Sequence, residues 1–142
     1  MDSQRCVLCD IGCGVMGARK IYEDEHTVGA LDIKPRFAKG QCVVFPKKHI
    51  ERITDLQDEE AVYLFRAVKE VYNKIEKLYK PERVALFMRG QTFPHIHVIL
   101  FPVFPGMDDI LGHFFKAFVF YEPLARISEA ELDEIAEKLR QQ

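Results

Sequence analysis

The chain has 142 residues, which is the size of one domain and enough to bury a core without a metal or a disulfide. Its 20 basic and 22 acidic residues give a net charge of −2, which disfavours dedicated nucleic-acid binding but leaves small phosphate ligands open. The longest apolar run, residues 97–104, is too short to cross a membrane, and the N-terminus lacks the apolar segment of a secretory signal. We therefore expect a cytoplasmic protein with no membrane partner.

The N-terminal half predicts three strands followed by one long helix. Residues 19–23, 27–32 and 41–46 have the composition of short strands, and Pro35 and Gly40 favour a turn before the third. From 58 to 79, apolar residues recur at helical spacing with charged residues between them. Acidic residues at 58–60 suit the amino end of that helix, and Pro81 ends it.

The C-terminal half predicts two more strands, 83–88 and 95–101, and then helices at 107–116 and 128–140. Ser128 and Glu131 match a capping box at the start of the last helix. Strands joined by short turns indicate antiparallel pairing. The predicted fold class is α+β, with an antiparallel sheet of about five strands, a long helix packed on it and C-terminal helices. We expect a domain over 1–105 and a helical extension, 106–142, packed on the same domain.

Three of the four cysteines lie within eight residues of one another. Cys6 and Cys9 form a Cys-x-x-Cys pair, and without a secretory signal such a pair is more often a metal or redox motif than a structural disulfide. A redox pair would lie where a strand meets a helix, whereas this pair precedes the first strand. Two buried cysteines are the plain alternative. Cys13 and Cys42 could complete a site of four thiolates, but Cys42 lies in an apolar strand and is more simply a core residue.

Histidines are the better source of further metal ligands. His95 and His97 alternate on one predicted strand, so both imidazoles should face the same side of the sheet, with Ile96 and Val98 on the other. His49 closes the segment Pro46-Lys47-Lys48-His49, just past a strand end where loop residues often carry function. The remaining two, His26 and His113, have no motif around them.

Five landmarks in this order resemble the histidine triad (HIT) superfamily of nucleotide hydrolases and transferases, over residues 5–103. They are Cys6-x-x-Cys9, Tyr22-Glu23-Asp24-Glu25, Leu31-Asp32-Ile33-Lys34-Pro35, Pro46-Lys47-Lys48-His49 and Gly90-Gln91-Thr92-Phe93-Pro94-His95-Ile96-His97. The signature of that family is three histidines alternating with apolar residues, after Gly-Gln and before a proline. Anchored on Gly90-Gln91 and Pro102, its three positions fall on His95, His97 and Ile99, so the third histidine is missing. The register Phe93, His95, His97 leaves the proline two residues too far.

The resemblance implies that His97, the middle histidine, attacks the α-phosphate of a purine nucleotide or dinucleotide. This attack would form a covalent nucleotidyl-histidine intermediate, which water or another acceptor would then break down. A neutral imidazole is nucleophilic near pH 7, and covalent catalysis divides one hard displacement into two easier ones. Gln91 and Thr92 match positions that contact the phosphate, and Asp32 matches the acidic residue that binds the ribose hydroxyls. A turn-initiating role is the plain alternative for Asp32.

The resemblance also implies a zinc site. Some members of the family bind zinc through the N-terminal Cys-x-x-Cys, the histidine of the Pro-Lys-x-His segment and the first triad histidine. Those positions are filled here by Cys6, Cys9, His49 and His95. Two thiolates and two imidazoles suit tetrahedral zinc, and with no open position the metal would be structural.

Two departures from the family pattern matter for activity. Ile99 removes a polar group that family members place near the substrate phosphate. The connection between the fourth and fifth strands also lacks the family's usual asparagine-containing stretch. The alternative function is therefore a HIT-fold nucleotide-binding protein with little or no catalysis. Another alternative is a small zinc-stabilised interaction module with four cysteine ligands. Homodimerisation is common in the family and is expected here.

Overall fold

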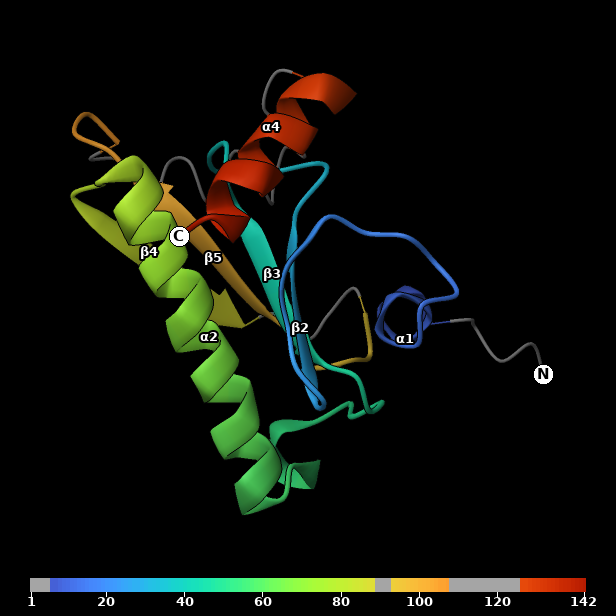
Figure 1. Ribbon diagram of the computed structural model, residues 1–142. Coiled ribbons are helices and arrows are strands. Elements are labelled where there is room, and N and C mark those ends of the chain that lie inside the picture. The colour runs from blue at the N-terminus through green and yellow to red at the C-terminus, as the bar shows by residue number, and fades with distance from the viewer. Residues whose placement is uncertain (1–5, 89–92, 108–125) are drawn as a thin grey trace.

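The computed structural model describes residues 6–88, 93–107 and 126–142. Five strands form one antiparallel sheet in the order β1-β2-β3-β5-β4. Helices α2 and α4 lie on one face of this sheet and the short helix α1 lies beside the other (Figure 1). The strands are β1 (Lys20–Glu23), β2 (Thr27–Leu31), β3 (Cys42–Pro46), β4 (Arg83–Met88) and β5 (Val98–Val103). The helices are α1 (Val7–Gly12), the 3₁₀ turn η1 (Ile53–Asp55), α2 (Asp58–Tyr79) and α4 (Glu129–Arg140). The predicted fold class is confirmed.

The turn between β1 and β2 is organised by Asp24. Its Oδ1 accepts hydrogen bonds from the backbone N–H groups of His26 and Thr27 and from the Thr27 hydroxyl, at 2.7–2.8 Å. Its Oδ2 accepts from the Tyr22 hydroxyl at 2.7 Å. One aspartate thus ends β1, begins β2 and sets the register of the hairpin.

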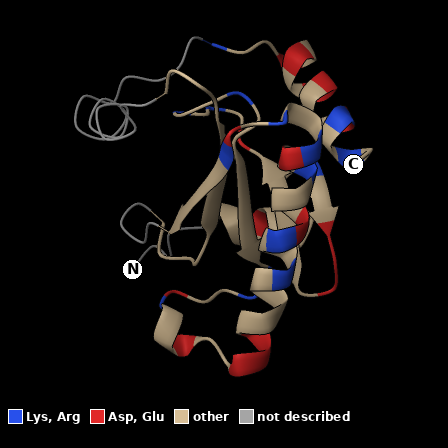
Figure 2. Ribbon diagram, turned by 90° about the vertical axis from the view of Figure 1, so that its left-hand side faces the viewer, with Lys and Arg blue, Asp and Glu red and all other residues tan. Residues whose placement is uncertain are grey.

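Helix α2 covers the sheet with a buried stripe at helical spacing, as the sequence predicts. Its first turn carries three acidic residues (Figure 2), and the Glu60 carboxylate accepts from the Gln57 backbone N–H at 3.0 Å. It ends at Tyr79, where Lys80 adopts left-handed backbone with φ 45° ahead of Pro81. The buried residues of the stripe are Leu64, Ala67, Val68, Val71 and Ile75.

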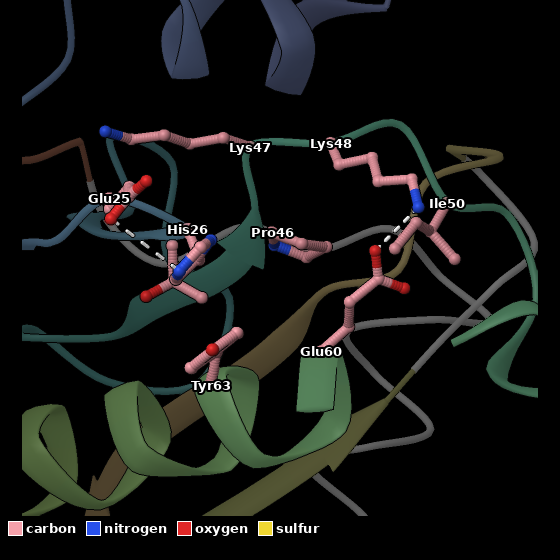
Figure 3. A pocket seen from close by; sticks show the side chains of 9 residues that line it. Glu25, His26, Pro46, Lys47, Lys48, Ile50, Glu60 and Tyr63 are labelled. Atoms are coloured by element: carbon pink, nitrogen blue, oxygen red, sulfur yellow. Dashed lines mark hydrogen bonds and ion pairs between the residues drawn. The ribbon is translucent and has the colours of Figure 1, made fainter. Parts of the chain in front are cut away.

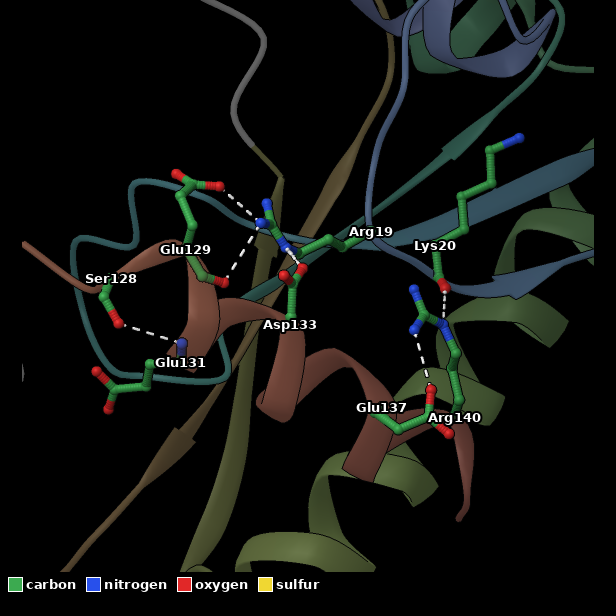
Figure 4. Close-up of polar contacts among 8 residues, drawn as sticks. All are labelled: Arg19, Lys20, Ser128, Glu129, Glu131, Asp133, Glu137 and Arg140. Carbon is green, nitrogen blue, oxygen red and sulfur yellow. Dashed lines mark hydrogen bonds and ion pairs between the residues drawn. The ribbon is translucent and has the colours of Figure 1, made fainter.

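Helix α4 adds its apolar side to the same core. Ser128 caps it, with its hydroxyl accepting from the Glu131 N–H at 3.2 Å. The Arg19 guanidinium, just before β1, donates to the Asp133 and Glu129 carboxylates at 2.6 Å each (Figure 4). The α4 residues in the core are Leu132, Ile135, Ala136 and Leu139. The predicted helix at 107–116 lies, from residue 108 on, outside the described residues. No helix of the described part of the chain is long and apolar enough to cross a membrane.

The opposite face of the sheet carries two smaller apolar clusters. Leu8 of α1 is buried against Val28, Ala30 and Phe45 of β2 and β3. Farther along this face, the second cluster covers β4 and β5, and its buried members are Phe37, Ala38, Phe101 and Val103. Helix α1 was not predicted, because six residues around a Cys-x-x-Cys give too short a periodic signal.

The start of the last predicted strand was wrong by three residues. Residues 95–97 precede β5, because the Ile96 N–H donates to the Ile50 carbonyl of a loop, at 2.7 Å, instead of joining the sheet. The predicted sides of His95, Ile96 and Val98 are nonetheless correct. Ile96 is buried in the core under α2 together with Val98, whereas His95 contacts Phe45 on the other face.

Candidate metal centre and nucleophile

Helix α1 presents its two cysteines to the sheet. Cys6 is the N-cap residue and Cys9 lies one turn later, so their thiols share a side of the helix. The backbone bonds Asp10 N to Cys6 O, at 3.0 Å, and Cys13 N to Cys9 O, at 2.9 Å, hold that turn. Because Leu8 is buried under the helix, the position of both thiols is fixed against β2 and β3.

The two thiols meet two imidazoles from distant parts of the chain. Cys6 Sγ lies 3.3 Å from His95 Nδ1, and Cys9 Sγ lies 3.3 Å from His49 Nδ1 and 3.5 Å from His95 Nδ1. One ligand atom from each of these four residues lies within 4.8 Å of the others. The structure therefore brings together all the residues that the sequence assigns to a metal site.

These distances fit a tetrahedral metal. With zinc–sulfur bonds of about 2.3 Å and zinc–nitrogen bonds of about 2.0 Å, a sulfur–nitrogen edge of a tetrahedron is about 3.5 Å long. The sulfur–nitrogen distances of 3.3–3.5 Å match this edge. The other ring nitrogen of His95, Nε2, donates to the Pro46 carbonyl at 2.8 Å, which turns the Nδ1 lone pair toward the thiols.

The electrostatics of the cluster also favour a cation. Burial, with the neighbouring Cys6 thiol, raises the pKa of Cys9 to about 11, so the thiol is protonated at neutral pH in the absence of a positive charge. Burial lowers the pKa of His95, against the opposing effect of its bond to Pro46, and so keeps the imidazole neutral. A divalent cation would stabilise the thiolate and accept the neutral imidazole as a ligand.

The other two cysteines do not join this group. Cys42 is fully buried in the core under α2, and its thiol donates to the Gly40 carbonyl at 3.2 Å. Cys13 is exposed, with its thiol 3.6 Å from the Asp10 carbonyl. The structure thus disfavours a site of four cysteines, because Cys42 lies on the opposite face of the sheet.

His97 is buried close to this cluster and has a defined tautomer. Its Nδ1 lies 2.8 Å from the His95 carbonyl oxygen, which can only accept. Nδ1 therefore carries the hydrogen, and Nε2 of the neutral ring keeps its lone pair. Phe93 packs edge-on to the ring, at 6.3 Å between centroids.

The predicted substrate residues are only partly described. Asp32 heads a turn, because its Oδ1 accepts from the Lys34 N–H at 2.8 Å. Its Oδ2 accepts from the side chain of buried Gln41 at 2.7 Å, and each carboxylate oxygen keeps a further lone pair for a ligand. Gln91 and Thr92 lie outside the described residues. The third triad position, Ile99, is half-buried and belongs to the apolar cluster that covers β4 and β5.

A pocket of about 140 Å³ lies between the end of β3 and helix α2, on the side of β3 away from the metal cluster (Figure 3). Its walls include Pro46, Ile50 and the stacked rings of His26 and Tyr63, whose centroids are 3.9 Å apart. Ligand pockets of drug-sized molecules hold roughly 300–1,000 Å³. This pocket is therefore too small for a nucleotide, and Asp32, the described member of the predicted substrate residues, does not line it.

The sequence reasoning missed three residues that support the site. Gln41 bridges Asp32 to the loop after it, Pro46 accepts from His95, and Glu51 lies 3.3 Å from His49 Nε2. Only Glu51 carries a signal in the sequence, as a carboxylate two residues after a predicted ligand.

The class of this protein is defined by an α+β fold with one antiparallel sheet and by a His-x-His pair that leads into one of its strands. The HIT domain family matches residues 14–105, so the chain belongs to the HIT family. An uncharacterised HIT-like protein of Methanocaldococcus jannaschii is 29% identical over 139 residues, covering 95% of this chain and 98% of that protein. A zinc-bound histidine triad family protein from Mycobacterium smegmatis has a TM-score of 0.75 and 26% identity, over 98% of this chain and 93% of that one.

Enzymes occur among the more distant relatives. Galactose-1-phosphate uridylyltransferase of Thermotoga maritima is 25% identical over 88% of this chain and 35% of its own length. An asymmetrical bis(5'-nucleosyl)-tetraphosphatase of Schizosaccharomyces pombe is 28% identical over 61% of this chain and 50% of its own length. The HIT superfamily therefore includes nucleotide hydrolases and nucleotidyltransferases.

Proposed function

We propose that this chain is an enzyme that hydrolyses or transfers a nucleotide at its α-phosphate, through a covalent nucleotidyl-histidine on His97. The observation that carries the proposal is the bond from His97 Nδ1 to the His95 carbonyl, because it leaves Nε2 as the nucleophilic nitrogen. The enzymes in the same superfamily support it.

In the proposed reaction, the Nε2 lone pair of His97 forms a bond to the α-phosphorus. The bond from phosphorus to the leaving group breaks and the leaving group departs with that electron pair. Water or another acceptor then attacks the same phosphorus and releases the imidazole. We assign Asp32 to the ribose hydroxyls and Gln91 and Thr92 to the phosphate oxygens, with a purine nucleotide or dinucleotide as substrate.

We propose that Cys6, Cys9, His49 and His95 hold a zinc ion with a structural role. Four protein ligands complete a tetrahedron, so the ion has no open position for water or substrate. When bound, it cross-links α1, the loop after β3 and the segment that leads into β5. His95 would thereby be held in place two residues before the proposed nucleophile.

The second candidate is a nucleotide-binding protein of the same fold with little catalysis. It is favoured by Ile99, whose side chain packs with Phe87 and Phe101 where the family has a polar histidine. Such a protein would bind a mononucleotide and form no covalent intermediate.

Intact-protein mass spectrometry separates the two candidates. The protein is mixed with a panel of nucleotide phosphoramidates and dinucleoside polyphosphates, and the expected result is a nucleotidyl adduct that maps to His97. The His97→Ala variant should fold, give no adduct and lose turnover, whereas His26→Ala, from the other face of the sheet, should behave as the unaltered protein. Turnover retained in His97→Ala would refute the assignment, and tight binding with no adduct would favour the second candidate.

We also propose a homodimer that forms through the β4 edge of the sheet. Leu86 and Met88 of this strand are 46% and 38% exposed, and β4 is the last strand of the sheet order. Phe65, 52% exposed, lies on the flank of α2 opposite Tyr63, which stacks on the β1–β2 turn. A second copy would cover these apolar side chains and pair the strand edge at the same time.

The remaining proposals concern organisation and location. We propose a HIT domain over 1–105 with 106–142 as an extension packed on it, consistent with the burial of α4 in the shared core. A cytoplasmic location suits the free thiols, because a reducing compartment keeps them available as ligands.

A further inference from the structure

The imidazole of His49 contacts a different group at each nitrogen. Its Nδ1 lies 3.3 Å from Cys9 Sγ in the metal cluster, and its Nε2 lies 3.3 Å from Glu51 Oε1. Glu51 comes two residues later in the same loop, so both contacts are made within one short segment. The ring therefore stands between a thiol on one side and a carboxylate on the other.

The carboxylate determines which ring nitrogen can bind a metal. An ionised carboxylate only accepts hydrogen bonds, so the hydrogen of a neutral ring is held on Nε2 and the lone pair remains on Nδ1. The other histidine of the cluster, His95, is held in the same tautomer by the Pro46 carbonyl, at 2.8 Å. Both histidines thus present Nδ1 to the thiols, one held by a backbone oxygen and the other by a side chain.

His49 needs this support more than His95 does. His95 is 1% exposed and is enclosed by Phe45 and the two cysteines, so its ring orientation is set by packing. The His49 side chain is 41% exposed, and water competes for its nitrogen atoms. A carboxylate bound to Nε2 is the arrangement that orients such an exposed ligand.

We propose that Glu51 is a positioning residue of the metal centre, which fixes the tautomer and orientation of His49 and so strengthens metal binding. The inference rests on the proposed metal site. Glu51 is itself 57% exposed, so its substitution should not affect folding. A matched control exists in the pair of His26 and Glu25, 3.9 Å apart with a similarly exposed histidine and no part in the cluster.

The test compares the unaltered protein with Glu51→Ala, Glu51→Gln and the control Glu25→Gln. Zinc affinity is measured by competition with a chromogenic chelator, and the geometry of the site by the visible spectrum of the cobalt-substituted protein. Loss of such a supporting group typically weakens metal binding 10- to 100-fold. Glu51→Ala should show that loss and an altered cobalt spectrum. Glu51→Gln should lie within about threefold of the unaltered protein, because its amide oxygen also accepts a hydrogen bond. Glu25→Gln should be unchanged.

Two results would overturn the inference. Zinc affinity and cobalt spectrum unchanged in Glu51→Ala would show that His49 needs no carboxylate. An equal loss of affinity in Glu25→Gln would show an effect of surface charge alone. If the unaltered protein binds neither zinc nor cobalt, the proposed metal site fails as well, and this outcome is distinct from the other two.

Discussion

Gly29, in the middle of β2, allows α2 to pack directly on the sheet. A Cβ at this position would lie 2.7 Å from Val71 Cγ2 and 3.2 Å from Tyr22 Cβ. Carbon atoms in contact are normally about 3.5–4.0 Å apart, so α2 would have to move by about 0.8 Å or more. Val71 is fully buried, so its side chain cannot turn out into solvent to relieve the contact. Overpacking of this kind costs about 1–3 kcal/mol, offset by about 0.4–1 kcal/mol from the smaller entropy of the unfolded chain.

We therefore expect Gly29→Ala to lower the free energy of unfolding by about 1–2 kcal/mol, measured by urea denaturation at a fixed metal concentration. Gly17→Ala is the matched control, since a Cβ there has no neighbour within 4 Å, and it should be neutral or slightly stabilising. In the double variant with Val71→Ala, the methyl group that clashes is gone. The combined loss should then be smaller than the sum of the single losses by about 1 kcal/mol. Strict additivity, or a Gly29→Ala protein as stable as the parent, would refute this account of the α2 contact.

Three further predictions concern the metal, the acid limit of stability and assembly. Dialysis against a chelator should lower the Tm and increase proteolysis of α1, and zinc should reverse both; an unchanged Tm would contradict a structural metal. Burial acts to raise the pKa of Asp24, but hydrogen bonds from Tyr22, Thr27 and the backbone outweigh it and lower that pKa in the folded state. The stability that this contributes is present above the unfolded pKa of about 3.9 and is lost as pH falls through the folded pKa. In Asp24→Asn, the free energy of unfolding should therefore fall less steeply below about pH 4 than in the unaltered protein. An equally steep fall would contradict this role of Asp24. Leu86→Lys should halve the mass measured by light scattering, whereas the same change at exposed Ile53 should leave it unaltered.

How far the sequence predicts the fold depends on how local each signal is. The bounds of α2 and β4 agree with the prediction to the residue, because the signals for both elements are local. Helix α2 has a long periodic apolar stripe that a proline ends, and β4 is a short strand between turns. The start of β5 was placed too early, because extended backbone at 95–97 has the same alternation whether or not it pairs with a neighbour. That difference depends on the bond from Ile96 to the Ile50 carbonyl, which is 46 residues away in the chain and has no sequence signature.

The candidate site shows the same division between local and distant information. The metal cluster was predicted from a family resemblance, and the structure brings its four members together from α1, a loop and the segment before β5. The spacing of Glu51 from His49 is a sequence signal, but it did not predict the contact, because the contact depends on which way the His49 ring faces. The predicted role of Asp32 at the ribose stays a prediction, although its place at the head of a turn is now observed.

His95 links the metal cluster to the proposed nucleophile through two different atoms. Its ring nitrogen Nδ1 faces the thiols of Cys6 and Cys9, while its backbone carbonyl accepts the Nδ1 hydrogen of His97. Any rotation of the His95 backbone would therefore disturb both the ligand set and the tautomer of the nucleophile. The proposed ion, with four protein ligands, would have no open position for substrate, so any effect on the proposed reaction would pass through this geometry. The proposed structural metal would therefore lie beside the proposed nucleophile without taking part in the proposed chemistry.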